Sequence, residues 1–165
     1  MVPLESLAQR VFTQTYGAWL TPELLREHLD SALSAPQLAR ELADPRYAYW
    51  VCEVDRSMSG FIKLADTRPP ACLRSPRAIE VAKLYVDADR RQRGVGSALM
   101  AAALASPRAT NAESVWLLVW EENTRALAFY ERWGFEAVGH QDVHVGDTAF
   151  HDLVMELTLG ARLDR

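Results

Sequence analysis

A chain of 165 residues fits one domain with its own hydrophobic core and needs no disulfide or metal to fold. Apolar residues make up 49% of the chain and charged residues 24%, which excludes a disordered protein. The formal net charge of −4 disfavours broad nucleic-acid binding, because that function needs a basic surface.

No segment predicts a membrane anchor or an export signal. The longest apolar run, residues 115–120, is far shorter than the ~20 residues that span a bilayer. The first residues lack the basic stretch and apolar block of a signal peptide. Cys52 and Cys72 are too few for a disulfide framework, which suits a reducing compartment. We therefore expect a cytoplasmic protein without membrane or nucleic-acid partners.

Apolar side chains at helical spacing dominate the first third of the chain. They recur over residues 4–12 and again over residues 24–32, and Thr21 and Pro22 give the N-cap and the first position of the second helix. A serine and a glutamine at the ends of residues 34–37 form the capping-box pattern and predict a third, short helix.

The pattern then changes to alternating strands and helices. Aromatic and β-branched residues on either side of a turn at 55–60 predict a hairpin, and the prolines of residues 66–77 predict a loop. Gly134 occupies the left-handed cap position at the end of a helix. The predicted strands cover residues 47–54, 61–65, 79–86, 115–120, 135–140 and 150–157, and the later predicted helices cover residues 95–105 and 124–133.

Residues 115–120 are apolar throughout, so this strand belongs to a sheet that is covered on both faces. The order of helices, a hairpin and then β-α-β-α-β-β predicts an α/β fold. The chain has no internal repeat and no low-complexity linker, and we expect a single domain over residues 1–165.

The most informative segment joins the strand that ends at Val86 to the helix that begins at Val95. Three arginines and a glycine lie between them, and a second glycine follows in the first helical turn. Glycine lets the backbone approach an anion closely, and unpaired N–H groups at a helix start point toward it. These residue types predict a diphosphate site; the alternative is a glycine-rich turn with a solvated basic face.

Two common diphosphate motifs do not fit this segment. A P-loop requires Gly-x-x-x-x-Gly-Lys-Ser/Thr, which the chain lacks. A dinucleotide-binding fold requires a third glycine, where the chain has Leu99. The run Arg91-x-x-Gly94-x-Gly96 instead resembles the pyrophosphate loop of the GNAT acetyltransferases.

A second block supports the same resemblance. A strand is followed by Asn123, then by a helix that carries Ala126, Phe129 and Tyr130, and then by a Gly-Phe pair. Two matched blocks in this order are similar to the hallmark motifs of the GNAT family.

The resemblance implies the GNAT acyltransferase fold, with a mixed central sheet flanked by helices, and acetyl-CoA as cosubstrate without a metal. The chain departs from the family where its first helix begins within a few residues of Met1, so the strand that usually precedes this helix is absent or trimmed. Asn123 would hydrogen-bond the pantetheine arm, and backbone N–H groups of residues 84–86 would face the thioester carbonyl. The coenzyme-binding residues that the resemblance implies are Leu84, Tyr85, Val86, Arg91, Gln92, Arg93, Gly94, Val95, Gly96, Ser97, Asn123, Ala126, Phe129 and Tyr130.

Acetyl transfer to an amine requires a base and benefits from an acid. Alkylamines with a pKa of about 10.4 are protonated at neutral pH, and the departing thiolate gains from a proton. The resemblance implies Glu80 as the base, acting through water, and Tyr130 as the acid. Glu80 is alternatively a surface strand residue or a contact for substrate charge. For Phe129 and Trp133 we favour a role as core aromatics on an amphipathic helix.

The acceptor is less well defined than the donor. Segments over roughly residues 6–157 resemble the PaiA-type spermidine/spermine acetyltransferases, which implies a small-molecule amine and the homodimer common in the family. Arg68, Arg74 and Arg77 would repel a polycation if they faced the pocket. A protein N-terminus or a lysine remains open as an acceptor, as does a non-catalytic acyl-CoA-binding role.

The remaining reactive side chains give no further site. Cys52 has no evident histidine partner, so we expect direct attack by the amine without an acyl-enzyme. The spacing of the four histidines matches no zinc signature, and we expect surface histidines and no metal site at His28, His140, His144 and His151.

Overall fold

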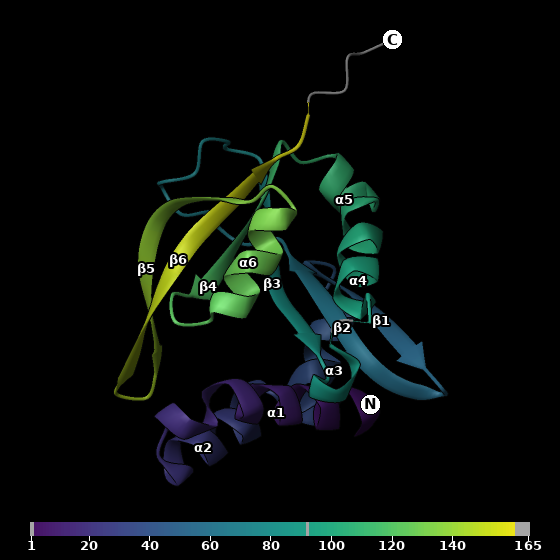
Figure 1. Cartoon of the computed structure of the whole chain (residues 1–165), viewed down its shortest axis with the longest axis vertical. Helices are drawn as coiled ribbons and strands as arrows, with labels where there is room; N and C mark the ends of the chain where they lie inside the picture. Colours follow the sequence, from purple (N-terminus) through teal and green to yellow (C-terminus); the bar gives the residue numbers. More distant parts are fainter. Residues whose placement is uncertain (1, 92, 161–165) are drawn as a thin grey trace. The chain divides into compact units, whose positions relative to one another are not determined.

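A computed structural model describes residues 2–91 and 93–160 of the chain (Figure 1). None of the helices in these residues has the length and apolar character needed to cross a membrane. In chain order, the elements are α1 (Val2–Tyr16), η1 (Gly17–Trp19), α2 (Pro22–Ala32), α3 (Ala35–Ala43), β1 (Tyr47–Val54), β2 (Ser57–Ala65), β3 (Ala78–Val86), η2 (Ala88–Arg90), α4 (Val95–Leu104), α5 (Pro107–Thr110), β4 (Ser114–Trp120), α6 (Thr124–Arg132), β5 (Glu136–Val145) and β6 (Thr148–Thr158).

The described residues fall into two compact units. The first unit holds the chain up to Leu64 and also Lys83–Ala103, and the second holds Ala65–Ala82 and the chain from Leu104 onward. Strand β3 therefore contributes residues to both units.

The strands of the described residues form a six-stranded sheet in the order β1-β2-β3-β4-β6-β5. In the second unit β3 pairs with β4 in parallel, and β6 pairs antiparallel with both β4 and β5. The parallel ladder is short, because it joins residues 78–80 to residues 114–116 and ends there. The sheet is mixed and has helices beside it, which confirms the predicted α/β fold class.

Helices α1 and α2 form where the apolar spacing predicted them. The apolar residues between Leu4 and Phe12 that share one helical face are buried. At the start of α2, the Oγ1 of Thr21 accepts a hydrogen bond from the Leu24 N–H at 3.3 Å, and Pro22 takes the first helical position.

Helix α3 begins after the predicted serine, but the predicted capping box is wrong. Ser34 is the N-cap residue, yet its side chain makes no capping hydrogen bond, and the side chain of Gln37 contacts Glu41 instead. The Oε1 of Glu5, on α1, accepts a hydrogen bond from the Ala35 N–H at 2.7 Å. A carboxylate 30 residues away in sequence thus replaces the local cap.

The β1–β2 hairpin has a tighter turn than the predicted one at 55–60. Asp55 and Arg56 have φ angles of 53° and 61°, which are the signs of a two-residue type I′ turn. Strand β2 therefore already begins at Ser57. The prediction was wrong because serines are common in turns, whereas Ser59 is a buried strand residue here.

In the second unit, Figure 1 shows helix α6 and the β5–β6 hairpin beside β4. Gly134 has a φ of 89° and ends α6 as predicted. Strands β5 and β6 are longer than predicted: β5 ends at Val145 and β6 begins at Thr148, so only two residues separate them. The helix α5 was not predicted, because a four-residue helix is too short to show a period of 3.6 residues.

Candidate functional site

The loop between β3 and α4 is anchored at its start by neighbours in the first unit. The N–H of Asp87 donates to the carbonyl oxygen of Ser59 at 2.9 Å. The Nη2 of Arg10 lies 2.6 Å from the Oδ2 of Asp87, and the Nε of Arg91 donates to the carbonyl oxygen of Val86 at 3.2 Å. These contacts hold the first half of the loop to β2, α1 and β3.

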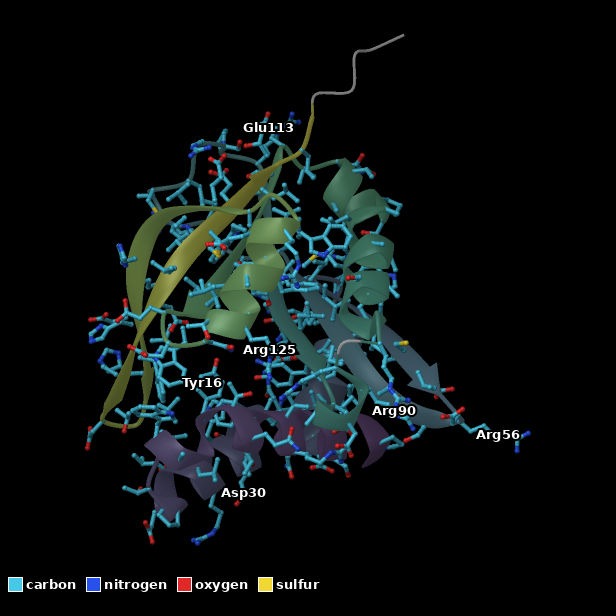
Figure 2. The ribbon with its side chains drawn as sticks, viewed as in Figure 1. Tyr16, Asp30, Arg56, Arg90, Glu113 and Arg125 are labelled. Atoms are coloured by element: carbon cyan, nitrogen blue, oxygen red, sulfur yellow. The ribbon has the colours of Figure 1, made fainter. Side chains whose placement is uncertain are left out.

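The arginines of this loop differ in what they contact. Arg90, labelled in Figure 2, forms an ion pair of 3.2 Å with Asp55 in the β1–β2 turn. Arg91 is turned back toward its own strand, whereas Arg93 is exposed. Gln92, which was also predicted to bind the coenzyme, lies outside the described residues.

Gly94 precedes helix α4 in a conformation that favours glycine. Its φ is 79°, and a Cβ atom placed there would meet no atom within 4 Å. The backbone is therefore open to a ligand at the point where a helix presents unpaired N–H groups and its positive end. Val95 is buried and is available only through its backbone, while Gly96 and Ser97 are partly or fully exposed. This arrangement fits a diphosphate.

Gly60 sets the position of α4 against β2. A Cβ atom on Gly60 would lie 2.9 Å from the carbonyl oxygen of Tyr85 and 3.0 Å from a methyl group of Val95. Any larger residue would push the start of α4 away from the sheet. The sequence interpretation assigned Gly60 to a turn and therefore missed this role.

In the second unit, Asn123 is the N-cap residue of α6. Its Oδ1 accepts a hydrogen bond from the Ala126 N–H at 3.3 Å, and its own N–H donates to the carbonyl oxygen of Trp120 at 2.9 Å. Asn123 therefore fixes the start of α6 directly after β4, a structural role beside its predicted contact with the pantetheine arm.

Tyr130 is the buried aromatic residue of α6. It is 9% exposed, and its ring packs edge-on against Phe135 with centroids 5.7 Å apart. Phe129 and Trp133 are only half-buried, so they are not the core aromatics that the sequence interpretation favoured. Tyr130 is buried instead because of the turn after α6. There the Phe135 N–H donates to the carbonyl oxygen of Tyr130, which places the Phe135 ring against the Tyr130 ring.

Glu80 lies at the last residue pair of the β3–β4 ladder, opposite Trp116. The hydroxyl of Thr67 donates to the Oε2 of Glu80 at 2.6 Å. Thr67 also lines a cavity of about 380 Å³ at the start of β3. The sequence interpretation missed Thr67, because a threonine within a proline-rich loop carries no motif of its own.

Two of the arginines that were expected to repel a cation have carboxylate partners. Arg77 lines the cavity, and its Nη2 lies 2.8 Å from the Oε1 of Glu113. The Nη1 of Arg74 lies 2.7 Å from the Oε2 of Glu136. Each ion pair offsets part of the positive charge near the loop.

One carboxylate oxygen on β6 is buried and has no hydrogen-bond donor among the described residues. Asp152 is 8% exposed, and no donor among the described residues reaches its Oδ1. Burial raises the pKa of Asp152 to about 6, against the opposing effect of His151. The sequence interpretation gave Asp152 no role, although the period of two in a strand places this charge between the buried Phe150 and Val154.

The histidines contribute one ion pair and one ring stack. The Nδ1 of His151 lies 2.7 Å from the Oδ1 of Asp142, a hydrogen bond that raises the pKa of His151. His28 is half-buried rather than on the surface and stacks on Phe12 with centroids 4.3 Å apart. Across residues 2–91 and 93–160, no group of three His, Cys, Asp or Glu residues gathers as metal ligands.

Comparison with known proteins identifies the family and the fold. The acetyltransferase (GNAT) family model matches residues 8–135. An uncharacterised N-acetyltransferase of Mycobacterium tuberculosis is 30% identical over 152 residues, which cover 92% of this chain and 93% of that protein. The PaiA N-acetyltransferase from Thermoplasma acidophilum, solved in complex with coenzyme A, has a TM-score of 0.73 at 19% identity, covering 96% of this chain and 92% of that one. Ard1 from Thermoplasma volcanium has a TM-score of 0.65 at 26% identity, covering 96% and 92%.

Proposed function

The chain belongs to the GNAT family and is an acetyl-CoA-dependent N-acetyltransferase, and from this premise we propose that it acetylates a primary amine of a small molecule by direct attack. The observation that carries the proposal is the start of α4, where Gly94 leaves the backbone open to a diphosphate. Acetyl-CoA is the cosubstrate that would bring a diphosphate and an activated acetyl group together.

We assign the coenzyme to the predicted residues of both motifs. The short β3–β4 ladder supports a role for the backbone of β3 after Glu80 in binding the thioester, because these residues are not part of that ladder. The coenzyme A complex of the Thermoplasma acidophilum protein supports coenzyme binding by this fold. The residues assigned are Leu84, Tyr85, Val86, Arg91, Gln92, Arg93, Gly94, Val95, Gly96 and Ser97 for the thioester and diphosphate, and Asn123, Ala126, Phe129 and Tyr130 for the pantetheine arm and thiol.

The proposed chemistry uses Glu80 as the base and Tyr130 as the acid. The amine nitrogen forms a bond to the acetyl carbon, and the carbon–sulfur bond breaks. Of the two protons that an ammonium loses, Glu80 passes the first to solvent through a water, so that the neutral amine attacks. The Tyr130 hydroxyl gives a proton to the departing thiolate and regains one from the product nitrogen through water.

We propose that the whole chain, residues 1–165, acts as one acetyltransferase domain. The family model supports this, since its match over residues 8–135 includes parts of both compact units. A homodimer, suggested by the family resemblance, and a cytoplasmic location both remain predictions.

Among small amines we favour a polyamine as the acceptor. The resemblance to PaiA-type enzymes supports this choice, and the ion pairs of Arg74 and Arg77 with carboxylates weaken the electrostatic objection to it. A protein amine is the second candidate acceptor.

Release of free thiol from acetyl-CoA, measured against a panel of amines, tests the proposal. The panel contains spermidine, spermine, putrescine, amino acids, N-terminal peptides and an aminoglycoside, with mass spectrometry of every product. We expect thiol release together with a singly acetylated small amine. Acetylation of peptides but of no small amine would indicate that the acceptor is a protein amine. If the protein binds coenzyme A but acetylates none of these amines, the result would contradict the proposed enzyme activity and favour a non-catalytic acyl-CoA-binding role.

A further inference from the structure

One face of the sheet in the second unit carries carboxylates and aromatic rings side by side. Trp116 pairs with Glu80 on β3 and with Glu156 on β6, and Trp120 pairs with Asp152 on β6. Paired residues point to the same side of a sheet, and so do residues two or four apart along one strand. These five side chains therefore share one face.

The two carboxylates of β6 on this face have different partners. Glu156 is 2% exposed and accepts hydrogen bonds from the N–H groups of Arg74, at 2.9 Å, and Ser75, at 3.3 Å. Asp152 is also buried, but no donor in the described residues reaches its Oδ1. Glu156 thus holds the loop of residues 66–77 in place, whereas Asp152 has no such structural task.

Among the described residues, no contact explains a carboxylate at position 152. Its sequence neighbour His151 points to the opposite face and pairs with Asp142 there. A buried carboxylate oxygen without a donor lowers stability, and Val154, at the next inward position, shows that this face of the strand accepts an apolar residue. A cationic ligand would supply the missing donor.

The surroundings of Asp152 suit an alkylammonium group. Trp120 lies opposite on β4 and Phe150 on the same face of β6, and their rings meet edge to face with centroids 5.3 Å apart. Aromatic rings attract an ammonium group, and a carboxylate binds it through charge-assisted hydrogen bonds. Trp120 is half-buried and Gln141, which pairs with Asp152 from β5, is exposed, so this end of the face borders solvent.

Asp152 is too far from Glu80 for both to contact one nitrogen. Glu80 is level with Trp116, and Asp152 is level with Trp120, four residues further along β4. At a rise of about 3.3 Å per residue, the two positions are about 13 Å apart along the strand. We propose that Asp152 binds a second ammonium group of the acceptor, remote from the nitrogen that is acetylated. The inference rests on the proposed function and gives the acceptor class as an amine with two cationic nitrogens.

The test compares a diamine with the monoamine of the same carbon chain, 1,8-diaminooctane and octylamine, in the acetyl-transfer assay. For the wild type we expect kcat/KM to be about 10- to 100-fold higher for the diamine, the range given by a hydrogen bond between charged groups. Asp152→Asn should reduce this ratio to about 1 and leave the octylamine value within about twofold, because octylamine has no second ammonium. Asp152→Glu, which keeps the carboxylate, should restore part of the preference.

Asp142→Asn is the matched control, because it removes the same charge from an exposed position of the same hairpin and should leave the ratio unchanged. A diamine preference that survives in Asp152→Asn, or its absence from the wild type, would overturn the proposal. Calorimetric titration of 1,8-diaminooctane into the protein separates this outcome from a failure of the proposed function. If no amine is acetylated, weaker diamine binding by Asp152→Asn still supports the subsite, and equal binding overturns it.

Discussion

Tyr130 combines a buried ring with the hydroxyl that we assign to the departing thiolate. Tyr130→Phe keeps the ring contact with Phe135 but removes the hydroxyl. We expect kcat to fall by about 10²-fold or more, the usual scale of general acid catalysis, with little change in coenzyme A affinity. An assay of thiol release measures kcat, and calorimetric titration measures the affinity for coenzyme A. Unchanged kcat would remove Tyr130 from the mechanism.

Glu80 is held by the hydroxyl of Thr67 and is assigned to deprotonate the amine. Glu80→Gln should therefore lower kcat/KM most near pH 6–7, where an alkylamine with a pKa of about 10.4 is almost fully protonated, and least near pH 10. A pH–rate profile from pH 6 to 10 checks this expectation. An equal loss at every pH would show that Glu80 positions the substrate without accepting its proton.

The sequence places the residues proposed for the coenzyme site in two motifs with a fixed order, and the structure shows which elements carry them. Gly94 is an example, since its place at the start of a helix was implied by the glycine spacing, whereas its positive φ is seen only in the structure. The partners of Glu80 and the burial of Asp152 could not be predicted. They depend on which loop and which strand face each carboxylate, and contacts between distant segments leave no local pattern.

Among the elements, the β1–β2 hairpin has a turn with two non-glycine residues in a left-handed conformation, Asp55 and Arg56. Arg56, which projects from the hairpin tip in Figure 2, has a φ of 61°. Arg56→Gly should raise the free energy of unfolding by about 1 kcal/mol, because a left-handed conformation costs a side chain about that much. Urea denaturation measures the change. Ser57→Gly, one residue later in the strand, is the control and should destabilise the protein.

The loop of residues 66–77 depends on the buried carboxylate of Glu156. Glu156→Ala should lower the free energy of unfolding by about 1–3 kcal/mol, because the N–H groups of Arg74 and Ser75 lose their acceptor. Hydrogen exchange of those two amides should also accelerate. Glu136→Ala removes an exposed ion pair with Arg74 and should change stability by less than about 0.5 kcal/mol. Equal effects of the two substitutions would contradict the anchoring role.

At the scale of the whole molecule, the titration of Asp152 links stability to pH. Burial raises its pKa from the usual 3.8 to about 6, so the folded chain holds this proton more tightly than the unfolded chain. Stability is therefore lost as the pH rises through that window. Asp152→Asn should raise the Tm relative to the wild type at pH 8, and the difference should shrink toward zero near pH 4. A difference in Tm that does not depend on pH would contradict the burial of an ionised carboxylate.

The sequence by itself determined the order of the main helices and strands, the α/β class and the family. These features depend on local patterns: hydrophobic periods of 2 and 3.6 residues, glycine positions and two motifs. Such patterns involve residues that are close in sequence, so they can be recognised without a structure. Only the tertiary structure decided that Glu5 caps α3, that Tyr130 is the buried aromatic of α6, and that no donor in the described residues reaches the Oδ1 of Asp152. These properties depend on contacts between segments far apart in sequence, because burial and hydrogen-bond partners are set only when strands and helices pack together.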